Sequence, residues 1–356
     1  MMQHQVIIVK DLQSELTEYL SSLTYNKLFV LTDVNTKENC LPLLQDVPAV
    51  KEATLITVNA GDTYKELEQL AFIWKTLSDK GASRDSLLIN LGGGMITDMG
   101  GFAGATFKRG IRTINIPTTL MASVDAAVGG KTGINFNGLK NEIGSFYPPL
   151  CVFIDSAFLQ TLDRDNILSG YAEMIKHALI SSESLLTQIL LFDLNCPLSV
   201  VHCPLSEMVA QSVAVKEEIV RQDPNEKGIR KALNLGHTVG HAFESLSFQK
   251  NQPLLHGHAV IAGIVCELYL SYKLCGFPME RLRQTVNYIK AYYPAFFYDC
   301  KDYESLYAFM THDKKNEAGI INFTLLANVG DVRINQQVPK ELLLESLDFY
   351  RESFGI

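Results

Sequence analysis

The feature that most restricts the fold is a regular alternation of short β-branched runs with longer amphipathic segments in the first part of the chain. Strand-like runs lie at 5–9, 27–31, 53–58, 86–91, 113–116 and 151–154, and helical patterns lie at 11–23, 64–80 and 95–107. Strands and helices that alternate in this way build a mainly parallel sheet covered by helices. We therefore predict an α/β fold for this part of the chain.

The pattern changes after residue 158, and helical periodicity then dominates. Helical patterns lie at 166–181, 204–221, 231–247, 258–274 and 278–292. No linker rich in proline, glycine or serine separates the two parts. We predict an α/β domain over residues 1–158 and a mostly α-helical domain over residues 159–356.

Composition excludes several classes of protein. The net charge of −8 disfavours nucleic acid as a partner, because phosphate backbones require a basic surface. Apolar runs such as 259–266 fall far short of the roughly 20 residues that span a bilayer. The seven cysteines are odd in number and never form Cys-x-x-Cys, which argues against both a disulfide framework and a thiolate zinc site. The beginning of the chain lacks the pattern of an export signal, so we expect a cytoplasmic protein without a membrane span.

A glycine turn, Leu91-Gly-Gly-Gly-Met-Ile-Thr-Asp98, lies between a predicted strand and a predicted helix. Bare backbone N–H groups at such a helix start can approach a pyrophosphate. Thr97 occupies the place of the third glycine in the dinucleotide fingerprint, so a purely structural turn is an open alternative. Polar residues also follow other strands, at 33–35, 61–65 and 118–119. They fall where ligands collect in open α/β sheets, although each is also a common cap or turn residue.

The segment 124–135 resembles a phosphate-binding loop, with Gly129-Gly-Lys-Thr-Gly133 at its centre. It is not a Walker loop, because Asp125 stands where that motif requires glycine. Lys131 between glycines suits an oxyanion, and Lys140-Asn141 follows with the same chemistry. A flexible surface turn is the alternative interpretation.

In the helical domain, Glu173, His237 and His256 form a set that can hold a catalytic zinc ion and leave coordination positions open. Lys176 shares a helix face with Glu173, and His241 shares one with His237. A single helical histidine is more often structural. Two histidines on one face together with a His-Gly turn favour a metal site.

The order of these segments and their amino-acid sequences resemble those of the 3-dehydroquinate synthase family. The resemblance spans about residues 30 to 330, through the segments 92–98, 108–110, 117–120, 124–125, 129–133, 140–141, 173–176, 234–241, 256–257 and 313–315. It implies a Rossmann-like NAD-binding domain followed by a mostly α-helical metal-binding domain. It also implies a cytoplasmic homodimer that uses NAD and Zn²⁺, with Co²⁺ as a possible substitute.

The activity that the resemblance implies is a cyclisation in the shikimate pathway, which leads to chorismate and the aromatic amino acids. A small anionic sugar phosphate, 3-deoxy-D-arabino-heptulosonate 7-phosphate, becomes 3-dehydroquinate and phosphate. Transient oxidation at C5 by NAD acidifies the C6 hydrogen and permits phosphate elimination. The ketone is then reduced, and ring opening with aldol closure forms the carbocycle. The enzyme is therefore a carbon–oxygen lyase.

The resemblance assigns residues by position. The implied zinc ligands are Glu173, His237 and His256. The implied substrate and catalytic residues are Asp125, Arg109, Lys131, Lys140, Asn141, Lys176, Lys216, Arg230, Asn234, His241 and Lys314, with Lys315 as an alternative to Lys314. The implied NAD shell is Asp33, Asn35, Asp62, Lys65, Gly93, Gly94, Asp98, Thr118, Thr119, Leu120, Asp125, Lys131, Lys140, Thr161 and Leu162.

One departure from the family pattern and three rival functions stay open. His258 replaces a frequent glutamate, which predicts an extra imidazole near the metal that could compete for zinc. The rivals are a glycerol dehydrogenase-like metal-dependent oxidoreductase, another sugar phosphate cyclase, and an inactive NAD-binding relative. The many cationic residues argue against a simple dehydrogenase. Arg230, Asn234 and the segment 313–315 argue against other cyclases, and the filled ligand positions argue against an inactive relative.

Overall fold

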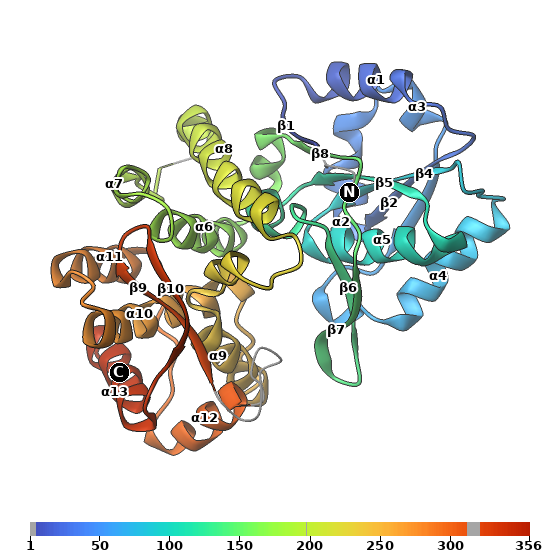
Figure 1. Ribbon diagram of the computed structural model, residues 1–356. Coiled ribbons are helices and arrows are strands. Elements are labelled where there is room, and N and C mark those ends of the chain that lie inside the picture. The colour runs from blue at the N-terminus through green and yellow to red at the C-terminus, as the bar shows by residue number, and fades with distance from the viewer. Residues whose placement is uncertain (1–4, 197, 312–320) are drawn as a thin grey trace. The chain divides into compact units, whose positions relative to one another are not determined.

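The chain forms two compact units, Met1–Asp163 and Arg164–Ile356, here called the N-terminal and C-terminal units. The computed structural model describes residues 5–196, 198–311 and 321–356. The N-terminal unit is a parallel sheet between helices with a protruding hairpin, and the C-terminal unit is mostly helical (Figure 1).

The N-terminal sheet confirms the predicted α/β fold. Its spatial order is β1-β8-β5-β4-β2-β3, and neighbouring strands are parallel. Each of the six predicted runs forms one of its strands: β1 (Gln5–Ile8), β2 (Leu28–Asp33), β3 (Thr54–Val58), β4 (Leu87–Gly92), β5 (Arg112–Pro117) and β8 (Cys151–Ile154). The central strands β2, β4 and β8 are buried along their whole length, as covering on both faces requires.

Helices pack on both faces of this sheet because successive strand side chains point in opposite directions. On one face, α1 (Leu12–Ser22) packs with Val30 and Ile89. On the other, α4 (Leu67–Asp79) and α5 (Gly94–Thr106) pack with Phe29 and Leu88. The short helices α2 (Val34–Asn39) and α3 (Pro48–Lys51) complete the unit.

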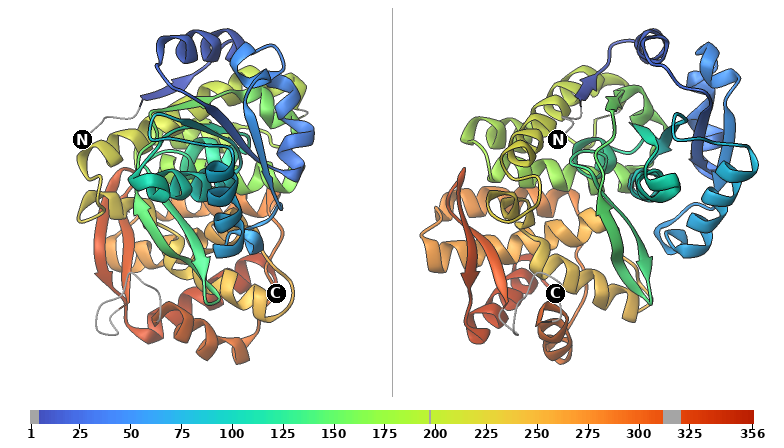
Figure 2. Two further views of the ribbon diagram at one scale, coloured as in Figure 1. Left: turned by 90° about the vertical axis from the view of Figure 1, so that its right-hand side faces the viewer. Right: turned by 45° about the vertical axis from the view of Figure 1, so that its right-hand side comes forward.

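An antiparallel hairpin begins within the segment 124–135, at Lys131. Strands β6 (Lys131–Phe136) and β7 (Leu139–Phe146) form a ribbon that extends away from the parallel sheet (Figure 2). Gly129 and Gly130 have φ values of 102° and 67° and turn the chain into β6. These glycines therefore shape the entry to the strand that Lys131 begins.

The C-terminal unit confirms the predicted mostly helical architecture. Its hairpin of β9 (Asn322–Asn328) and β10 (Asp331–Gln337) was not predicted. Its helices are α6 (Arg164–Leu179), α7 (Glu183–Leu191), α8 (Leu198–Gln222), α9 (His237–Gln249), α10 (His256–Cys275), α11 (Met279–Tyr292), α12 (Tyr303–Thr311) and α13 (Lys340–Phe354).

Two predicted helix boundaries in this unit were wrong. The pattern 231–247 is interrupted, because a 3₁₀ helix ends at Asn234 and Gly236 adopts a left-handed conformation with φ of 78°. Helix α9 therefore begins at His237. The His-Gly segment at 256 was expected to form a turn, but His256 is the first residue of α10.

Among the described helices, α10 is long and apolar enough to cross a membrane, with a mean hydropathy of 1.3. About two thirds of it, 67%, is buried. Helices α6, α9 and α13 and strand β9 all pack against it. We therefore interpret α10 as the central core helix of the C-terminal unit.

We predict that Gly100→Ala destabilises the protein. A Cβ at this position of α5 would lie 2.0 Å from Asn90 Oδ1 and 2.8 Å from Leu31 Cδ2, both of which are buried. Alanine favours a helix by about 1 kcal/mol over glycine, but overpacking costs about 1–3 kcal/mol. Urea unfolding followed by circular dichroism should show a lower midpoint. An unchanged or higher midpoint would show that the sheet can relax around the added methyl group.

Candidate functional site

Three side chains in the C-terminal unit converge as the sequence predicts for a metal site. Glu173 comes from the middle of α6, and His237 and His256 are the first residues of α9 and α10. Their ligand atoms all lie within 4.8 Å of one another. Glu173 Oε1 is 3.7 Å from His237 Nε2 and 3.6 Å from His256 Nε2. Two ligand atoms bound tetrahedrally at about 2 Å from one zinc ion lie about 3.3 Å apart, so this donor set fits such an ion.

Glycines allow the three helices to approach closely enough for this convergence. A Cβ on Gly257 would lie 1.9 Å from the backbone oxygen of Ser169 in α6. A Cβ on Gly263 would lie 2.1 Å from the backbone oxygen of Gly236 at the start of α9. Helix α10 thus packs backbone to backbone against both neighbours, beside the residues that carry the proposed ligands.

A hydrogen bond orients the His237 imidazole, and an ion pair orients that of His256. His237 Nδ1 lies 3.2 Å from the carbonyl oxygen of Leu235, and because a carbonyl only accepts, Nδ1 is the protonated nitrogen. The Nε2 atom that faces Glu173 then carries the lone pair that a metal requires. His256 Nδ1 lies 3.7 Å from Glu244 Oε2, which is the carboxylate–histidine arrangement of many zinc sites.

The sequence analysis missed Glu244 and Glu267. Glu244 shares a helix face with His237 and His241, so its spacing was a usable signal. Glu267 in α10 is fully buried and accepts hydrogen bonds from the backbone N–H groups of Gly236 at 2.6 Å and Val239 at 3.2 Å. It satisfies the otherwise bare start of α9 and so fixes His237. No local pattern predicts this contact, because the partners lie about thirty residues apart.

Opposing influences set the pKa of His256. Burial lowers the pKa of this imidazole. The carboxylates of Glu173 and Glu244 raise the pKa by more than burial lowers it, and the result is a pKa of about 10. The metal-free imidazole is therefore protonated at neutral pH, and a bound dication would have to displace that proton.

Cationic and polar residues expected at the substrate surround this centre. Lys176 forms a buried ion pair with Glu173 one helical turn away. The His241 ring lies 5.4 Å from that of His237 and 5.9 Å from that of His256, measured between centroids. Two of the substrate residues predicted in this unit, Lys176 and His241, thus lie next to the proposed metal ligands.

Lys216 and Arg230 are also buried, in α8 and in the 3₁₀ helix that follows it. Arg230 Nη1 donates to the carbonyl oxygen of Pro224 at 2.6 Å. Asn234 donates a hydrogen bond to Glu226 Oε1 at 3.3 Å. The sequence analysis did not identify Glu226 as a partner of a site residue, although Pro224 is a signal for a turn at this place. The predicted residue Lys314 and its alternative Lys315 lie outside the described residues.

His258 does not belong to the metal-ligand group among the described residues. It is buried, and its ring packs edge-on against Tyr293 with centroids 5.7 Å apart. The structure therefore places the His258 ring outside the donor set of Glu173, His237 and His256. His258 is two residues after His256 in α10, and at about 100° per residue its side chain leaves the helix about 200° around the axis from that of His256.

In the N-terminal unit, predicted cofactor residues gather at the carboxyl ends of the strands. Gly93 and Gly94 begin α5 directly after β4, and Gly92 pairs with Pro117 at the end of β5. A Cβ on Gly93 would lie 3.0 Å from Thr119 Cγ2. Thr118, Leu120, Thr161 and Leu162 follow β5 and β8 at the same edge.

Asp33 confirms the structural alternative that the sequence left open. Its Oδ1 accepts from the backbone N–H groups of Asn35 at 2.8 Å and Thr36 at 2.9 Å, which caps α2. The cap fixes the carboxylate at the end of β2, so a cofactor role and a capping role are compatible.

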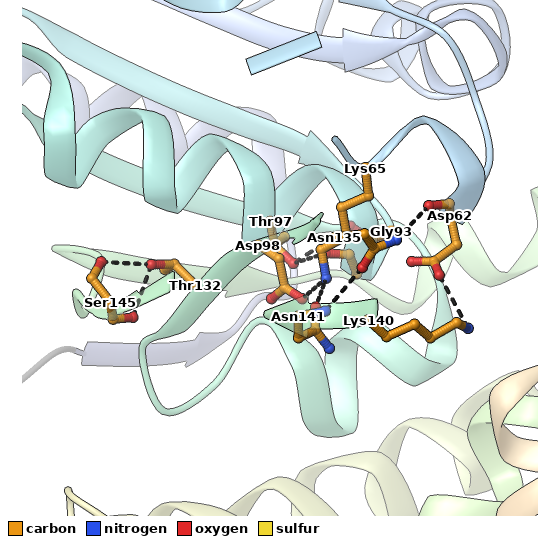
Figure 3. Close-up of polar contacts among 11 residues, drawn as sticks. Asp62, Lys65, Gly93, Thr97, Asp98, Thr132, Asn135, Lys140, Asn141 and Ser145 are labelled. Atoms are coloured by element: carbon orange, nitrogen blue, oxygen red, sulfur yellow. Dashed lines mark hydrogen bonds and ion pairs between the residues drawn. The ribbon is translucent and has the colours of Figure 1, made fainter. Parts of the chain in front are cut away.

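Two ion pairs connect the predicted residues of the loop at 61–65 with α5 and the β6–β7 hairpin (Figure 3). Lys65 is buried, and its Nζ lies 2.5 Å from both Asp98 Oδ2 and Asn141 Oδ1. Lys140 Nζ lies 3.1 Å from Asp62 Oδ2. Residues assigned to the cofactor and residues assigned to the substrate therefore contact each other directly.

Arg109 is not brought to this edge. Helix α5 starts at the carboxyl end of β4 and runs back along the sheet, so Arg109 at its far end lies near the amino end of β5. Lys108 beside it accepts a hydrogen bond from Arg84 through its carbonyl oxygen, just before β4. Asp125 lies in a π-helical turn, Ala122–Ala126, and Lys131 is the first residue of β6.

Comparison with known proteins gives a consistent result. The family model described as 3-dehydroquinate synthase N-terminal matches residues 55–169, and the C-terminal model of the same family matches residues 170–316. A 3-dehydroquinate synthase of Parabacteroides distasonis is 71% identical over 356 residues, covering 100% of both chains.

Solved structures of other cyclases share the fold. The 2-epi-5-epi-valiolone synthase of Streptomyces hygroscopicus subsp. jinggangensis, with NAD⁺ and Zn²⁺ bound, superposes with a TM-score of 0.84 at 22% identity, covering 98% of this chain and 97% of that one. A 2-deoxy-scyllo-inosose synthase complexed with carbaglucose-6-phosphate, NAD⁺ and Co²⁺ gives a TM-score of 0.80 at 20% identity, covering 98% and 96%.

We predict that His237→Ala lowers the affinity for zinc by at least tenfold, because it removes one of three protein ligands. Zinc content after dialysis, measured by atomic emission, checks this prediction. His258→Gln is the matched control, since it alters a neighbouring buried imidazole outside the ligand group. Equal zinc content in His237→Ala and the unaltered protein would contradict the assignment, as would loss of zinc in the control.

Proposed function

Because the chain belongs to the 3-dehydroquinate synthase family, we propose that it converts 3-deoxy-D-arabino-heptulosonate 7-phosphate to 3-dehydroquinate and phosphate. The observation that carries the proposal is the convergence of Glu173, His237 and His256 beside the Lys176 ammonium. The family relationship makes the chain an NAD-using cyclase. Phosphate elimination and the use of zinc are the finer parts of the proposal.

The two cofactors fit residues that are present. Glu173, His237 and His256 would hold Zn²⁺ or Co²⁺, and the hydrogen bond of His237 and the ion pair of His256 with Glu244 support this donor set. The bare start of α5 at Gly93 and Gly94 would hold the pyrophosphate of NAD. When bound, zinc polarises a substrate hydroxyl, and NAD takes up and returns a hydride.

The cationic residues account for an anionic substrate. Each unit contributes cations, with Lys131 and Lys140 in the N-terminal unit and Lys176, Lys216 and Arg230 in the C-terminal unit. They would bind the carboxylate and the phosphate, and Asn141 and Asn234 would orient the hydroxyl groups by hydrogen bonds. Arg109, at the far end of α5, stays a proposed contact of the substrate phosphate.

His241 is our candidate for proton transfer. Its ring lies beside those of both proposed histidine ligands. An imidazole can accept and return a proton near neutral pH, and elimination requires a proton to leave the carbon next to the transient ketone. We propose that Asp125, in its π-helical turn, lies where the cofactor and the substrate meet.

The rival functions explain fewer of these observations. A glycerol dehydrogenase-like oxidoreductase needs the metal and the dinucleotide but has no use for buried cations such as Lys216 and Arg230. Another sugar phosphate cyclase would share the fold, but the 71% identical relative is a 3-dehydroquinate synthase. We further propose a cytoplasmic homodimer that binds neither nucleic acid nor membrane.

The decisive experiment measures phosphate release from the heptulosonate phosphate. We expect phosphate and 3-dehydroquinate in equal amounts, no net accumulation of NADH, loss of activity with a chelator, and recovery with Zn²⁺ or Co²⁺. Steady NADH formation from glycerol would favour the dehydrogenase. Binding of NAD and metal without phosphate release would favour an inactive relative.

We predict that Lys131→Ala raises the KM for the heptulosonate phosphate roughly 10- to 100-fold, because a charge-assisted contact is lost, while the Kd for NAD changes much less. Steady-state kinetics and NAD titration together check this. Lys75→Ala, on the exposed side of α4, is the control. Equal losses of substrate and NAD binding would count against the placement of Lys131 at the substrate.

A further inference from the structure

We propose that Asn135, in β6, is a positioning residue that holds the proposed substrate residues Lys140 and Asn141 against the proposed cofactor loop at 61–65. The proposal deepens the function proposed above and rests on it. Asn135 ends the segment 124–135 but lies outside the segments that carry the family resemblance, and the proposal rests on its contacts.

Asn135 makes three hydrogen bonds to two separate segments (Figure 3). Its backbone N–H donates to the carbonyl oxygen of Lys65 at 2.7 Å, and its Nδ2 donates to that of Asp62 at 2.9 Å. Its Oδ1 accepts from the backbone N–H of Asn141 at 3.0 Å. Carbonyl oxygens only accept and backbone N–H groups only donate, so these partners fix the orientation of the side-chain amide.

The hydrogen bonds of Asn135 lie at the one irregular position in the pairing of β6 with β7. Ile134 pairs with Ile143 and Phe136 pairs with Leu139, so Asn135 alone lies opposite the three residues 140–142 of β7. Asn141 lies in this bulge with φ of 50°, a left-handed conformation that asparagine adopts more readily than most residues with a side chain. The hydrogen bond from its N–H to Asn135 holds the bulge in this form.

The bulge determines where two proposed substrate residues lie. Asn141 Oδ1 is 2.5 Å from Lys65 Nζ, which fixes the whole side-chain amide of Asn141, including its donor end. Lys140 Nζ is 3.1 Å from Asp62 Oδ2. Asn135 therefore acts on the reaction through its neighbours, because it keeps both side chains in register with the loop at 61–65.

A purely structural role would show itself differently. The Asn135 side chain is half-buried near the turn of the hairpin and belongs to neither cluster of buried apolar residues, although its neighbour Ile134 belongs to one of them. Loss of its side chain should therefore leave the thermal unfolding midpoint close to that of the unaltered enzyme. A positioning role predicts an effect on substrate KM that is larger than the effect on stability.

The first test compares Asn135→Ala with Asn137→Gly in the full-length enzyme loaded with NAD and zinc. Asn137 lies in the exposed turn of the same hairpin, and glycine tolerates its φ of 50°. We expect Asn135→Ala to raise the KM for the heptulosonate phosphate about tenfold, through the loss of two side-chain hydrogen bonds, with the unfolding midpoint unchanged. Asn137→Gly should leave KM unchanged. Equal KM values for the two variants, or a KM increase matched by global destabilisation, would overturn the proposal.

A double-mutant cycle tests whether Asn135 acts through Asn141. Asn141→Gly keeps the left-handed backbone but removes the side chain that Asn135 is proposed to position. Asn135→Ala should then raise KM clearly less in the Asn141→Gly background than in the unaltered enzyme. Fully additive effects on KM would exclude action through Asn141.

Hydrogen exchange separates this inference from the proposed activity. Asn135→Ala should increase amide exchange in peptides covering 139–146, whereas Asn137→Gly should not. This readout requires no turnover. An unaltered enzyme that releases no phosphate would refute the proposed function, whereas normal phosphate release with unchanged exchange in Asn135→Ala would refute only the role of Asn135.

Discussion

The close backbone contact of α10 with α6 and α9 is the constraint on which the C-terminal unit depends. Gly257 and Gly263 have no side chains, and a methyl group at either place would collide with a backbone oxygen. This contact brings a carboxylate and two imidazoles within metal-binding distance. Buried Glu267 completes the arrangement, because it caps the helix whose first residue is His237. The donors are thus positioned by the backbone before any cofactor binds.

The N-terminal unit solves a related problem with polar contacts. Parallel strands bring the ends of β2, β4 and β5 to one edge, but the β6–β7 hairpin is no part of that sheet. Lys65 attaches it through partly buried contacts with Asp98 and Asn141, and Asn135 hydrogen-bonds to the same loop. Charge-assisted contacts of this kind are strong when water is excluded, which gives an exposed ribbon a defined position.

Much of this could be predicted from the sequence, because the relevant signals are local. Alternating strand and helix patterns predicted all six strands of the parallel sheet and the change to helices. Residue types and spacing identified Glu173, His237 and His256. The errors were also local in origin. The helical pattern at 231–247 concealed the break at Gly236, and the His-Gly segment at 256 was expected to form a turn although it begins α10.

The sequence by itself determined the fold class, the family, and the chemical nature of the donors, since these follow from periodicity and residue identity. Only the tertiary structure decided which of those residues meet. It excluded His258 from the metal group and separated Arg109 from the carboxyl edge of the sheet. It also revealed Glu244, Glu267 and Asn135 as partners of site residues. Such contacts join segments far apart in the chain, and their distances and hydrogen-bond directions exist only once the helices and strands have packed.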